Sequence, residues 1–463
     1  MFNCPNCNKS LPADSDFCPY CGSKLTAVKN TEAPEKKKGT KAWKVVLIVL
    51  SVLLVLGIGA GAAFYFLTAD SDPEDTDVVV DEESEEESTT EETTTEDEEI
   101  TQVVVDKTGE LVIGFSGPLT GPASYYGNAV YNGIELAVNE INTNGGIDGM
   151  TIKLISADDM ADTAVDAANA YNSLKNQGMQ IFIGPVTSGS ALAVKGSTYY
   201  DNMFQLTPTA SSDEVIENNN CFQICYSDSD QGARAAEYID EHNLATKVGI
   251  IYNSADTYST GIYNSFKSAA AGKNFSIVAE MSFTYDNCFD FTAQIQACKS
   301  AGADLVFLPI YYSEASLILK QSDEVNYNPQ FFGCDGLDGI LSAYNFDTSL
   351  AEGLMMLAPF CEADTDSAIQ DFVDAYYLKY NQNPDMFAAA GYDAVYAIKA
   401  AAEKGDINPQ MTASEICEKM KSVMTQVTIN GLTGNNMTWS ANGEVNKAPK
   451  AVKIQNGTYV SAD

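Results

Sequence analysis

The feature that most constrains this chain is an apolar run of 23 residues, Val45 to Leu67, interrupted only by Ser51 and by small glycine and alanine residues. A helix rises about 1.5 Å per residue, so a run of this length crosses the roughly 30 Å hydrocarbon core of a bilayer. A cleaved signal peptide has a shorter apolar region and a small-residue cleavage motif, and here 44 residues precede the run. The run therefore predicts a transmembrane helix at residues 45–67.

Charge is distributed unevenly on the two sides of this run. Residues 1–44 carry eight lysines and four acidic residues, and a lysine excess beside a membrane helix predicts the cytoplasmic side. Residues 68–108 are rich in Asp, Glu, Thr and Ser, which is typical of a disordered, self-repelling stalk. We therefore expect a single-pass protein of the cell membrane, with its N-terminus in the cytoplasm and its C-terminal domain outside. The net charge of −38 argues against nucleic acid as a partner.

Four cysteines stand in two CxxC pairs within residues 1–26, at Cys4, Cys7, Cys18 and Cys21. Two such pairs place four thiolates at the corners of a tetrahedron, which is the geometry of a structural Zn²⁺ site. The segment resembles the short zinc ribbons at the N-termini of many bacterial membrane proteins, so Zn²⁺ is the expected cofactor, and a basic linker follows at 27–44. The alternative, a redox or disulfide pair, requires only two of the four cysteines.

Histidine and arginine each occur once, as His242 and Arg234. A catalytic triad would have a single candidate base, and a multi-histidine metal site cannot form. His242 follows Asp240 and Glu241, which predicts a solvated surface position. The composition therefore indicates a protein that is not an enzyme. It also indicates that a bound carboxylate is held by hydroxyls and backbone amides unless Arg234 itself holds it.

Residues 109–463 alternate short apolar strands with amphipathic helices, which predicts an α/β fold with parallel sheets. Single cores stop growing at about 250 to 300 residues, so a segment of this length is expected to form two lobes. The predicted strands are 111–116, 151–157, 181–183, 204–206, 247–252, 277–283, 304–309 and 353–358. The predicted helices are 128–142, 163–176, 230–242, 258–271, 291–300, 314–324, 367–380 and 386–404.

Five motifs follow one another in this segment: LVIGFSGPLTGPASYY at 111–126, GIELAVNEINTNGGIDG at 133–149, IGPVTS at 183–188, LTPTAS at 206–211 and SDSDQG at 227–232. In this order they resemble the type I periplasmic binding proteins of the leucine/isoleucine/valine-binding family, the substrate receptors of branched-chain amino acid ABC transporters. The resemblance covers residues 109 to 463. It implies a two-lobed clamp, with one lobe at 109–228 and 359–430, the other at 229–358 and 431–463, and crossings near 228, 358 and 430.

Such folds bind ligands at the carboxyl ends of parallel strands, where loops and helix starts present free N–H groups. Ser188 is expected at a helix N-cap, where its hydroxyl and the nearby N–H groups hold a ligand carboxylate. Thr209 and Ser211 offer oxygens to a ligand ammonium, as the family's matching positions do. The resemblance adds as ligand-binding residues Tyr126, Asp228, Tyr258, Tyr311 and Asp335. Asp335 stands where the family often has Glu, which shortens its reach. Helix capping, aromatic packing and turn formation are the competing structural roles at these positions.

Two functional hypotheses follow from these features. The first is a membrane-anchored solute-binding protein that captures an amino acid or a similar small zwitterion and delivers it to an ABC permease. The alternative is a membrane receptor that senses the ligand and signals through the zinc ribbon to a cytoplasmic partner. The sequence leaves the ligand's side chain open. The seven cysteines after residue 109 are odd in number, and we expect mostly free thiols.

Overall fold

The computed structural model of the chain describes residues 2–3, 10–11, 107–447 and 450–462. The four cysteines expected to bind zinc, the membrane helix expected at 45–67 and the linker at 27–44 lie outside the described residues, as does nearly all of the stalk expected at 68–108. Near the N-terminus, strand β1 (Phe2–Asn3) pairs antiparallel with β2 (Ser10–Leu11). No helix within the described ranges is long and apolar enough to cross a membrane.

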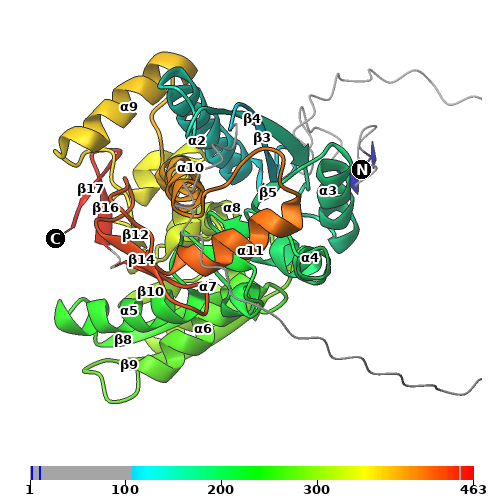
Figure 1. Cartoon of the computed structure of the whole chain (residues 1–463). Helices are drawn as coiled ribbons and strands as arrows, with labels where there is room; N and C mark the ends of the chain where they lie inside the picture. The colour runs from blue at the N-terminus through cyan, green and yellow to red at the C-terminus, as the bar shows by residue number, and fades with distance from the viewer. Residues whose placement is uncertain (1, 4–9, 12–106, 448–449, 463) are drawn as a thin grey trace, which may run out of the picture. The chain divides into compact units, whose positions relative to one another are not determined.

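The first lobe is built on a sheet of five parallel strands in the order β4-β3-β5-β6-β7 (Figure 1). Its strands are β3 (Gly109–Gly117), β4 (Met150–Asp158), β5 (Ile181–Ile183), β6 (Gln205–Thr207) and β7 (Cys221–Gln223). Crossover helices α2 (Ser124–Thr143), α3 (Ala164–Asn176) and α4 (Ser188–Tyr200) connect them. Every residue of β5, β6 and β7 is buried, as expected for parallel strands that are covered on both faces.

The second lobe is built on a seven-stranded sheet in the order β17-β16-β12-β11-β10-β8-β9. Its parallel strands are β8 (Lys247–Asn253), β9 (Ser276–Phe283), β10 (Leu305–Leu308), β11 (Gln330–Gly333) and β12 (Met355–Ala358). The helices of this lobe are α5 (Asp228–Glu241), α6 (Thr257–Ala269), α7 (Thr292–Ala301) and α8 (Tyr312–Glu324). Two antiparallel strands, β16 (Lys450–Gln455) and β17 (Thr458–Ser461), extend the sheet beyond β12.

Three later helices pack on the first lobe: α9 (Ser367–Tyr380), α10 (Met386–Lys404) and α11 (Ala413–Met424). Helix α10 lies against α2, a contact visible in Figure 1. A Cβ added at Gly133 of α2 would collide with the Ala388 carbonyl, and one added at Gly391 of α10 would collide with the Val130 carbonyl. The two helix backbones therefore approach so closely that each needs glycine at the contact.

The chain passes between the lobes three times, and the third crossing lies later than expected. The first falls between Gln223 and Asp228, and the second between Ala358 and Ser367. A small sheet of β13 (Thr428–Ile429), β14 (Met437–Trp439) and β15 (Val445–Asn446) precedes the third. This sheet belongs to the first lobe, because Trp439 Nε1 donates to the Gln223 carbonyl at 2.7 Å. The expected assignment of 431–446 to the second lobe is therefore wrong, and the crossing follows β15.

The expected two-lobed α/β fold with parallel sheets is confirmed. The strand predicted at 181–183 and the helices predicted at 367–380 and 386–404 have the expected bounds. The eight predicted strands did not include β11, β7 or the C-terminal antiparallel strands, and the predicted helices lacked α11. The missed strands are short, and most of them mix polar with apolar residues, so their hydrophobic periodicity is weak.

The seven cysteines that the structure describes after residue 109 are free thiols, as expected. All are buried except Cys288, which is partly exposed. Burial raises the pKa of the Cys221, Cys225 and Cys334 thiols, so these side chains stay protonated and unreactive at neutral pH.

Candidate functional site

The carboxyl ends of the two sheets face each other across the interface between the lobes. A cavity of about 20 Å³ lies there, and six of the eight expected ligand-binding residues line it. These six are Tyr126, Ser188, Thr209, Tyr258, Tyr311 and Asp335. The first three come from the first lobe and the last three from the second, so the cavity, which we call the cleft site, lies between the two lobes.

Ser188 is poised to donate a hydrogen bond into the cleft site. Its hydroxyl oxygen accepts from the backbone N–H groups of Ser211 at 3.2 Å and Ser212 at 3.1 Å. Two accepted bonds occupy both lone pairs of the oxygen, which leaves its own hydrogen for a ligand. The structure corrects the expected capping: Thr187 is the N-cap, and Ser188 is the first residue of α4. The N–H groups of this first turn lack intrahelical partners and favour an anion.

Ser211 and Asp228 lie one layer behind the cavity wall rather than on it. The Ser211 hydroxyl donates to Asp228 Oδ1 at 2.7 Å, and Asp228 Oδ2 is buried without a hydrogen-bond partner in the described part of the chain. A Cβ placed on Gly261 of α6 would lie 2.7 Å from that oxygen, so Oδ2 points toward α6. Burial raises the pKa of Asp228 well above its usual range, which the Ser211 bond only partly offsets. Asp228 therefore ties α5 to the first lobe through its bond to Ser211.

Asp335 is held in place by two side chains of its own lobe. The Tyr258 hydroxyl donates to Asp335 Oδ1 at 2.7 Å, and Gln231 Nε2 donates to Oδ2 at 3.0 Å. Burial raises the pKa of Asp335 to about 6, against the lowering effect of these two bonds. The carboxylate is therefore mostly ionised at neutral pH. Sequence reasoning missed Gln231, although it belongs to the SDSDQG motif.

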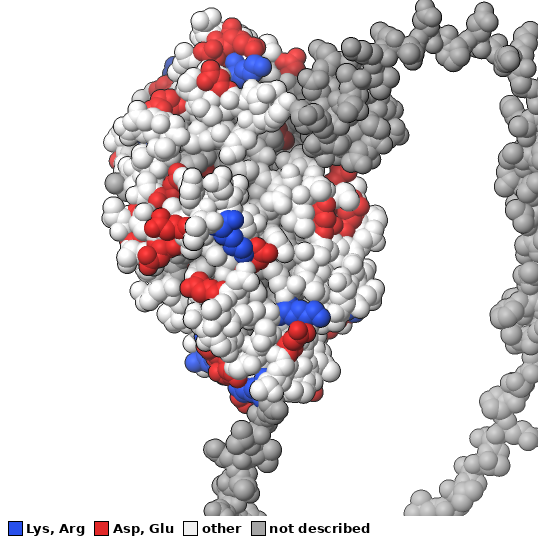
Figure 2. Space-filling view, turned by 90° about the horizontal axis from the view of Figure 1, so that it is seen from above, with Lys and Arg blue, Asp and Glu red and all other residues white. Residues whose placement is uncertain are grey.

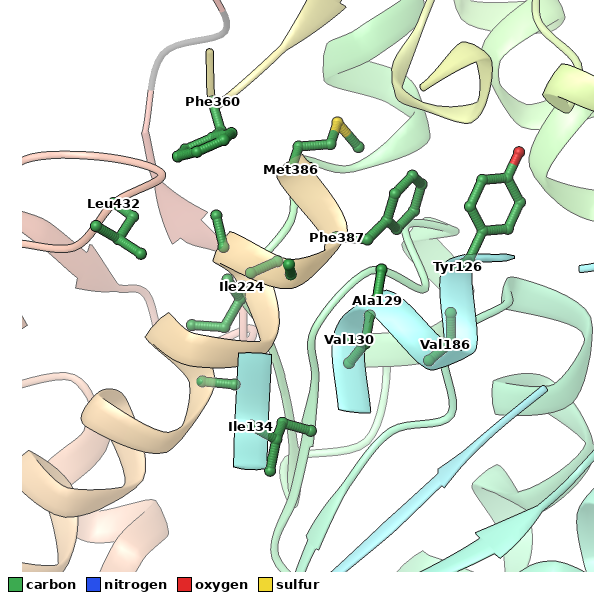
Figure 3. Packing of buried hydrophobic residues seen from close by; sticks show 14 of the residues in the cluster. Tyr126, Ala129, Val130, Ile134, Val186, Ile224, Phe360, Met386, Phe387 and Leu432 are labelled. Atoms are coloured by element: carbon green, nitrogen blue, oxygen red, sulfur yellow. The ribbon is translucent and has the colours of Figure 1, made fainter. Parts of the chain in front are cut away.

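Aromatic rings form most of the remaining wall. Tyr258 and Tyr311 stack with their ring centroids 5.0 Å apart, and Tyr126 meets Tyr311 edge to face at 5.5 Å. Phe387 lies at the start of α10, and its ring centroid is 4.3 Å from that of Tyr126. Figure 3 shows the two rings side by side above Val186. Sequence reasoning missed Phe387 because no motif marks the start of α10.

Tyr126 closes the interface between the lobes. Its hydroxyl donates to the Gly336 carbonyl at 2.6 Å and accepts from the Tyr312 N–H at 3.2 Å, and both partners belong to the second lobe. A cavity of about 20 Å³ holds roughly one water molecule. The lobes are thus closed on each other, and a larger ligand enters only when they separate.

Basic side chains take no direct part in the cleft site: neither lysine nor arginine lines it among the described residues. Arg234 forms ion pairs with Glu237 at 3.0 Å and Glu241 at 3.3 Å on α5. His242 is exposed at the end of α5, as expected, and its ring stacks on the Tyr238 ring with the two centroids 4.0 Å apart. The site therefore offers hydroxyls, helix N–H groups, one carboxylate and aromatic faces, which suit a small zwitterion.

Comparison with known proteins finds matches to two separate parts of the chain. Residues 110–458 match the family described as periplasmic binding protein, and residues 3–25 match the zinc-ribbon domain. The Leu/Ile/Val-binding protein BraC3 of Rhizobium johnstonii is 29% identical over 332 residues, which cover 70% of this chain and 89% of that protein. The Leu/Ile/Val-binding protein of Escherichia coli is 26% identical over 349 residues, which cover 73% of this chain and 93% of that protein.

A solved structure shares the fold. It is the branched-chain amino acid transporter substrate-binding protein LivJ of Streptococcus pneumoniae in complex with isoleucine, which superposes with a TM-score of 0.68 at 26% identity. The superposition covers 76% of this chain and 98% of that one. The similarity therefore extends over the whole two-lobed domain.

Proposed function

This chain belongs to the type I periplasmic binding proteins of the branched-chain amino acid family, and from that premise we propose that its two lobes close on a free amino acid. Members of the family are solute-binding proteins rather than enzymes, which agrees with the scarcity of candidate bases. The observation that carries the proposal is Ser188, whose available hydrogen and helix N–H groups border a cavity with aromatic walls.

The carboxylate of the amino acid binds at the start of α4. Ser188 donates its hydroxyl hydrogen, and the N–H groups of the first helical turn supply further bonds to the anion. Each bond from a neutral donor to a charged group contributes about 1.5 to 3 kcal/mol. No arginine is needed, which matches the surface ion pairs of Arg234.

The ammonium of the amino acid binds on the opposite side of the cleft site. The Thr209 hydroxyl donates to the Val186 carbonyl at 2.7 Å, so its lone pairs remain free to accept from the ligand. Asp335 supplies the negative charge from the second lobe. Because its two oxygens already accept from Tyr258 and Gln231, the ammonium adds a third donor to this carboxylate.

Binding favours the closed arrangement of the lobes. The ligand contacts Ser188 and Thr209 on one lobe and Tyr258, Tyr311 and Asp335 on the other, so its contacts are complete only in the closed form. A ligand that binds one form better shifts the equilibrium toward it by the difference in binding free energy. The closed form is then the form that a permease recognises.

We further propose that the protein is anchored in the cell membrane through residues 45–67, with the two-lobed domain outside, and delivers its ligand to an ABC permease. Support comes from the apolar run and from relatives named as transporter components. Deletion of the gene should then lower uptake of the radiolabelled ligand. Unchanged uptake together with altered gene expression would instead favour the sensor hypothesis. No observation on the described residues supports that hypothesis.

The N-terminal zinc-ribbon match supports a structural zinc ion. The thiolates of Cys4, Cys7, Cys18 and Cys21 would hold it, since four sulfur donors in two CxxC pairs are the donor set that Zn²⁺ prefers. Bound zinc would supply the folding energy of this small segment. Metal analysis of the full-length protein should find one zinc per chain, and Cys4→Ser with Cys18→Ser should remove it.

Isothermal titration of the full-length protein against the common amino acids tests the binding proposal. We expect saturable heat with at least one aliphatic amino acid and a higher unfolding temperature in its presence. Absence of both heat and thermal shift with every amino acid would contradict the proposal.

A further inference from the structure

A second and larger cavity lies between the lobes, beside the second crossing. Its volume is about 520 Å³, and its lining residues include Tyr125, Tyr312, Phe360, Tyr459, Asp338 and Asp385. None of the described residues lines both this cavity and the cleft site. We call it the interlobe chamber. Its volume falls in the range of small-molecule sites, about 300 to 1,000 Å³.

The chamber has aromatic walls from both lobes. Tyr125 of α2 and Tyr312 of α8 lie with their ring centroids 5.4 Å apart. Phe360 reaches the chamber from the second crossing, and Tyr459 reaches it from β17. Ring faces attract organic cations through their quadrupoles.

Two carboxyl groups meet in the chamber from opposite lobes. Asp338, which follows β11, accepts from the Met386 N–H at 3.1 Å and the Gly339 N–H at 2.9 Å. Asp385 is the N-cap of α10 and accepts from the Ala388 N–H at 2.8 Å. Both acids therefore lie at the start of the same helix when the lobes are closed.

The other groups that face this pair are tyrosine hydroxyls rather than basic side chains. Tyr459 hydrogen-bonds to Asp338, and Tyr125 hydrogen-bonds to Asp385. Among the described residues, neither lysine nor arginine lines the chamber, and Glu362 adds a third acid to its wall. Burial raises the pKa of Asp338 to about 8, with a further contribution from Asp385, whose own pKa burial raises to about 6. Within the described lining, the pair therefore has backbone N–H and tyrosine partners but no side chain that carries a positive charge.

The surface around the domain has the same sign. Acidic side chains clearly outnumber basic ones on the face shown in Figure 2. A negative field of this kind concentrates cations near the protein and disfavours anions.

We propose that the interlobe chamber binds an organic ammonium cation, at a site separate from the amino acid site. The ammonium lies against Asp338 and Asp385, and its carbon atoms pack on Tyr125, Tyr312 and Phe360. The volume, the aromatic walls and the two carboxyl groups without a lysine or arginine among the described lining residues each point to this ligand class. Because its lining comes from both lobes, the ligand favours the closed form, as the amino acid does.

Titration of the full-length protein with choline tests the proposal. The control ligand is 3,3-dimethylbutan-1-ol, a neutral molecule of nearly the same shape as choline. We expect choline to bind and the alcohol to bind at least about 10-fold more weakly, since the alcohol makes no charged contact. Equal binding of the two would overturn the proposal, and so would the failure of choline to bind.

Variants locate the site. Asp338→Asn with Asp385→Asn should weaken choline binding by about 10- to 100-fold. Tyr312→Leu, which keeps the backbone bonds of Asp338, should weaken it by about 5-fold or more. The matched control is Asp374→Asn at an exposed position of α9, which should leave it unchanged. Undiminished choline binding in both the double variant and Tyr312→Leu would contradict the chamber as its site.

The two sites are separable in the same experiment. Choline binding that survives Ser188→Ala, with amino acid binding lost, would support a separate site. Choline binding that disappears together with amino acid binding in Ser188→Ala, in a protein whose unfolding temperature is unchanged, would place choline in the cleft site and overturn the inference. If no amino acid binds the wild type but choline binding depends on Asp338 and Asp385, the proposed function fails and this inference stands.

Proton release gives an independent readout. An ammonium beside Asp338 favours its ionised form, so binding at pH 7 should release protons, and the measured heat should differ between phosphate and Tris buffers. Equal heats after correction for dilution would contradict contact with this acid.

Discussion

The cleft site and the interlobe chamber occupy the same interface between the lobes but differ in packing and charge. The cleft site is about 20 Å³ and is lined by hydroxyls, stacked rings and one carboxylate, whereas the chamber is about 520 Å³ and holds two carboxyl groups from opposite lobes. Residues that are adjacent in sequence line different cavities. Tyr126 and Tyr311 line the cleft site, whereas their neighbours Tyr125 and Tyr312 line the chamber. The same helix starts therefore present different chemistry on their two sides.

This division explains why the closed form is tight on one side only. Tyr126 forms two hydrogen bonds across the interface, and its ring packs on Tyr311 and Phe387. On the other side, Asp338 accepts from the Met386 N–H across the interface at 3.1 Å, but Asp385 lies beside it, and repulsion between two ionised carboxyl groups opposes this contact. Closure is thus stabilised by Tyr126 at the cleft site, and at the chamber it depends on the charge of this acid pair. The following predictions test this contrast.

The largest expected effect comes from the cleft site. Ser188→Ala with Thr209→Ala should weaken amino acid binding by about 3 to 6 kcal/mol, because each change removes a hydrogen bond to a charged group. Isothermal titration measures the effect, and Ser197→Ala, at an exposed position of the same helix, serves as control. Unchanged affinity in the double variant would show that the ligand binds elsewhere, while choline binding should persist in it.

A steric change should act on the cleft side alone. A Cβ at Gly336 would lie 2.6 Å from the Tyr258 hydroxyl and 2.8 Å from the Ile310 carbonyl, so Gly336→Ala should destabilise the protein by about 1 to 3 kcal/mol. Thermal unfolding measures this loss. In Gly196→Ala the added methyl meets nothing within 4 Å, and replacing a helical glycine should stabilise by about 0.5 to 1 kcal/mol. Equal effects of the two changes would contradict the tight packing at Gly336.

The chamber side should respond to pH. The pKa of Asp338 is about 8 in the folded protein and about 4 in an unfolded chain. Between these values the folded state binds more protons, so the free energy of unfolding falls as pH rises. The expected loss between pH 6 and pH 8 is up to about 2 kcal/mol, and Asp338→Asn should flatten the profile. Chemical denaturation at both pH values measures it, and an equally steep profile in the variant would exclude Asp338 as the source.

The smallest expected effect is at the only arginine. Arg234 pairs with Glu237 and Glu241 on a half-exposed face of α5, away from both cavities. Exposed ion pairs contribute little, so Arg234→Gln should change stability by less than about 1 kcal/mol. Affinity for both ligands should stay the same, and a large loss of amino acid binding would show that Arg234 holds the carboxylate.

The sequence predicted the fold and most of the cleft site because ordered motifs mark both. Ser188, Thr209 and Tyr126 each stand in a motif that begins within a strand and continues into the loop after it, and the structure brings them to one cavity. Asp228 and Ser211 stand in motifs as well, but their side chains bond to each other behind the wall. A motif places the backbone, whereas the direction of a side chain depends on packing between distant segments.

The chamber was beyond prediction for the same reason. Tyr125, Asp338, Asp385 and Tyr459 come from four segments far apart in sequence, and no spacing relates them. They meet only after both lobes have formed and closed. The third crossing was misplaced because β13, β14 and β15 are two or three residues long and carry too little periodicity to show which lobe they join.

Trp439 offers an optical view of the first lobe. The sequence contains two tryptophans, Trp43 and Trp439, and the second is buried with its indole N–H bonded to the Gln223 carbonyl. Both partners belong to the first lobe, so this bond persists when the lobes rotate and breaks only when that lobe unfolds. In a Trp43→Phe variant the emission wavelength therefore reports unfolding of the first lobe. This readout separates loss of ligand binding from loss of folding in the variants described above.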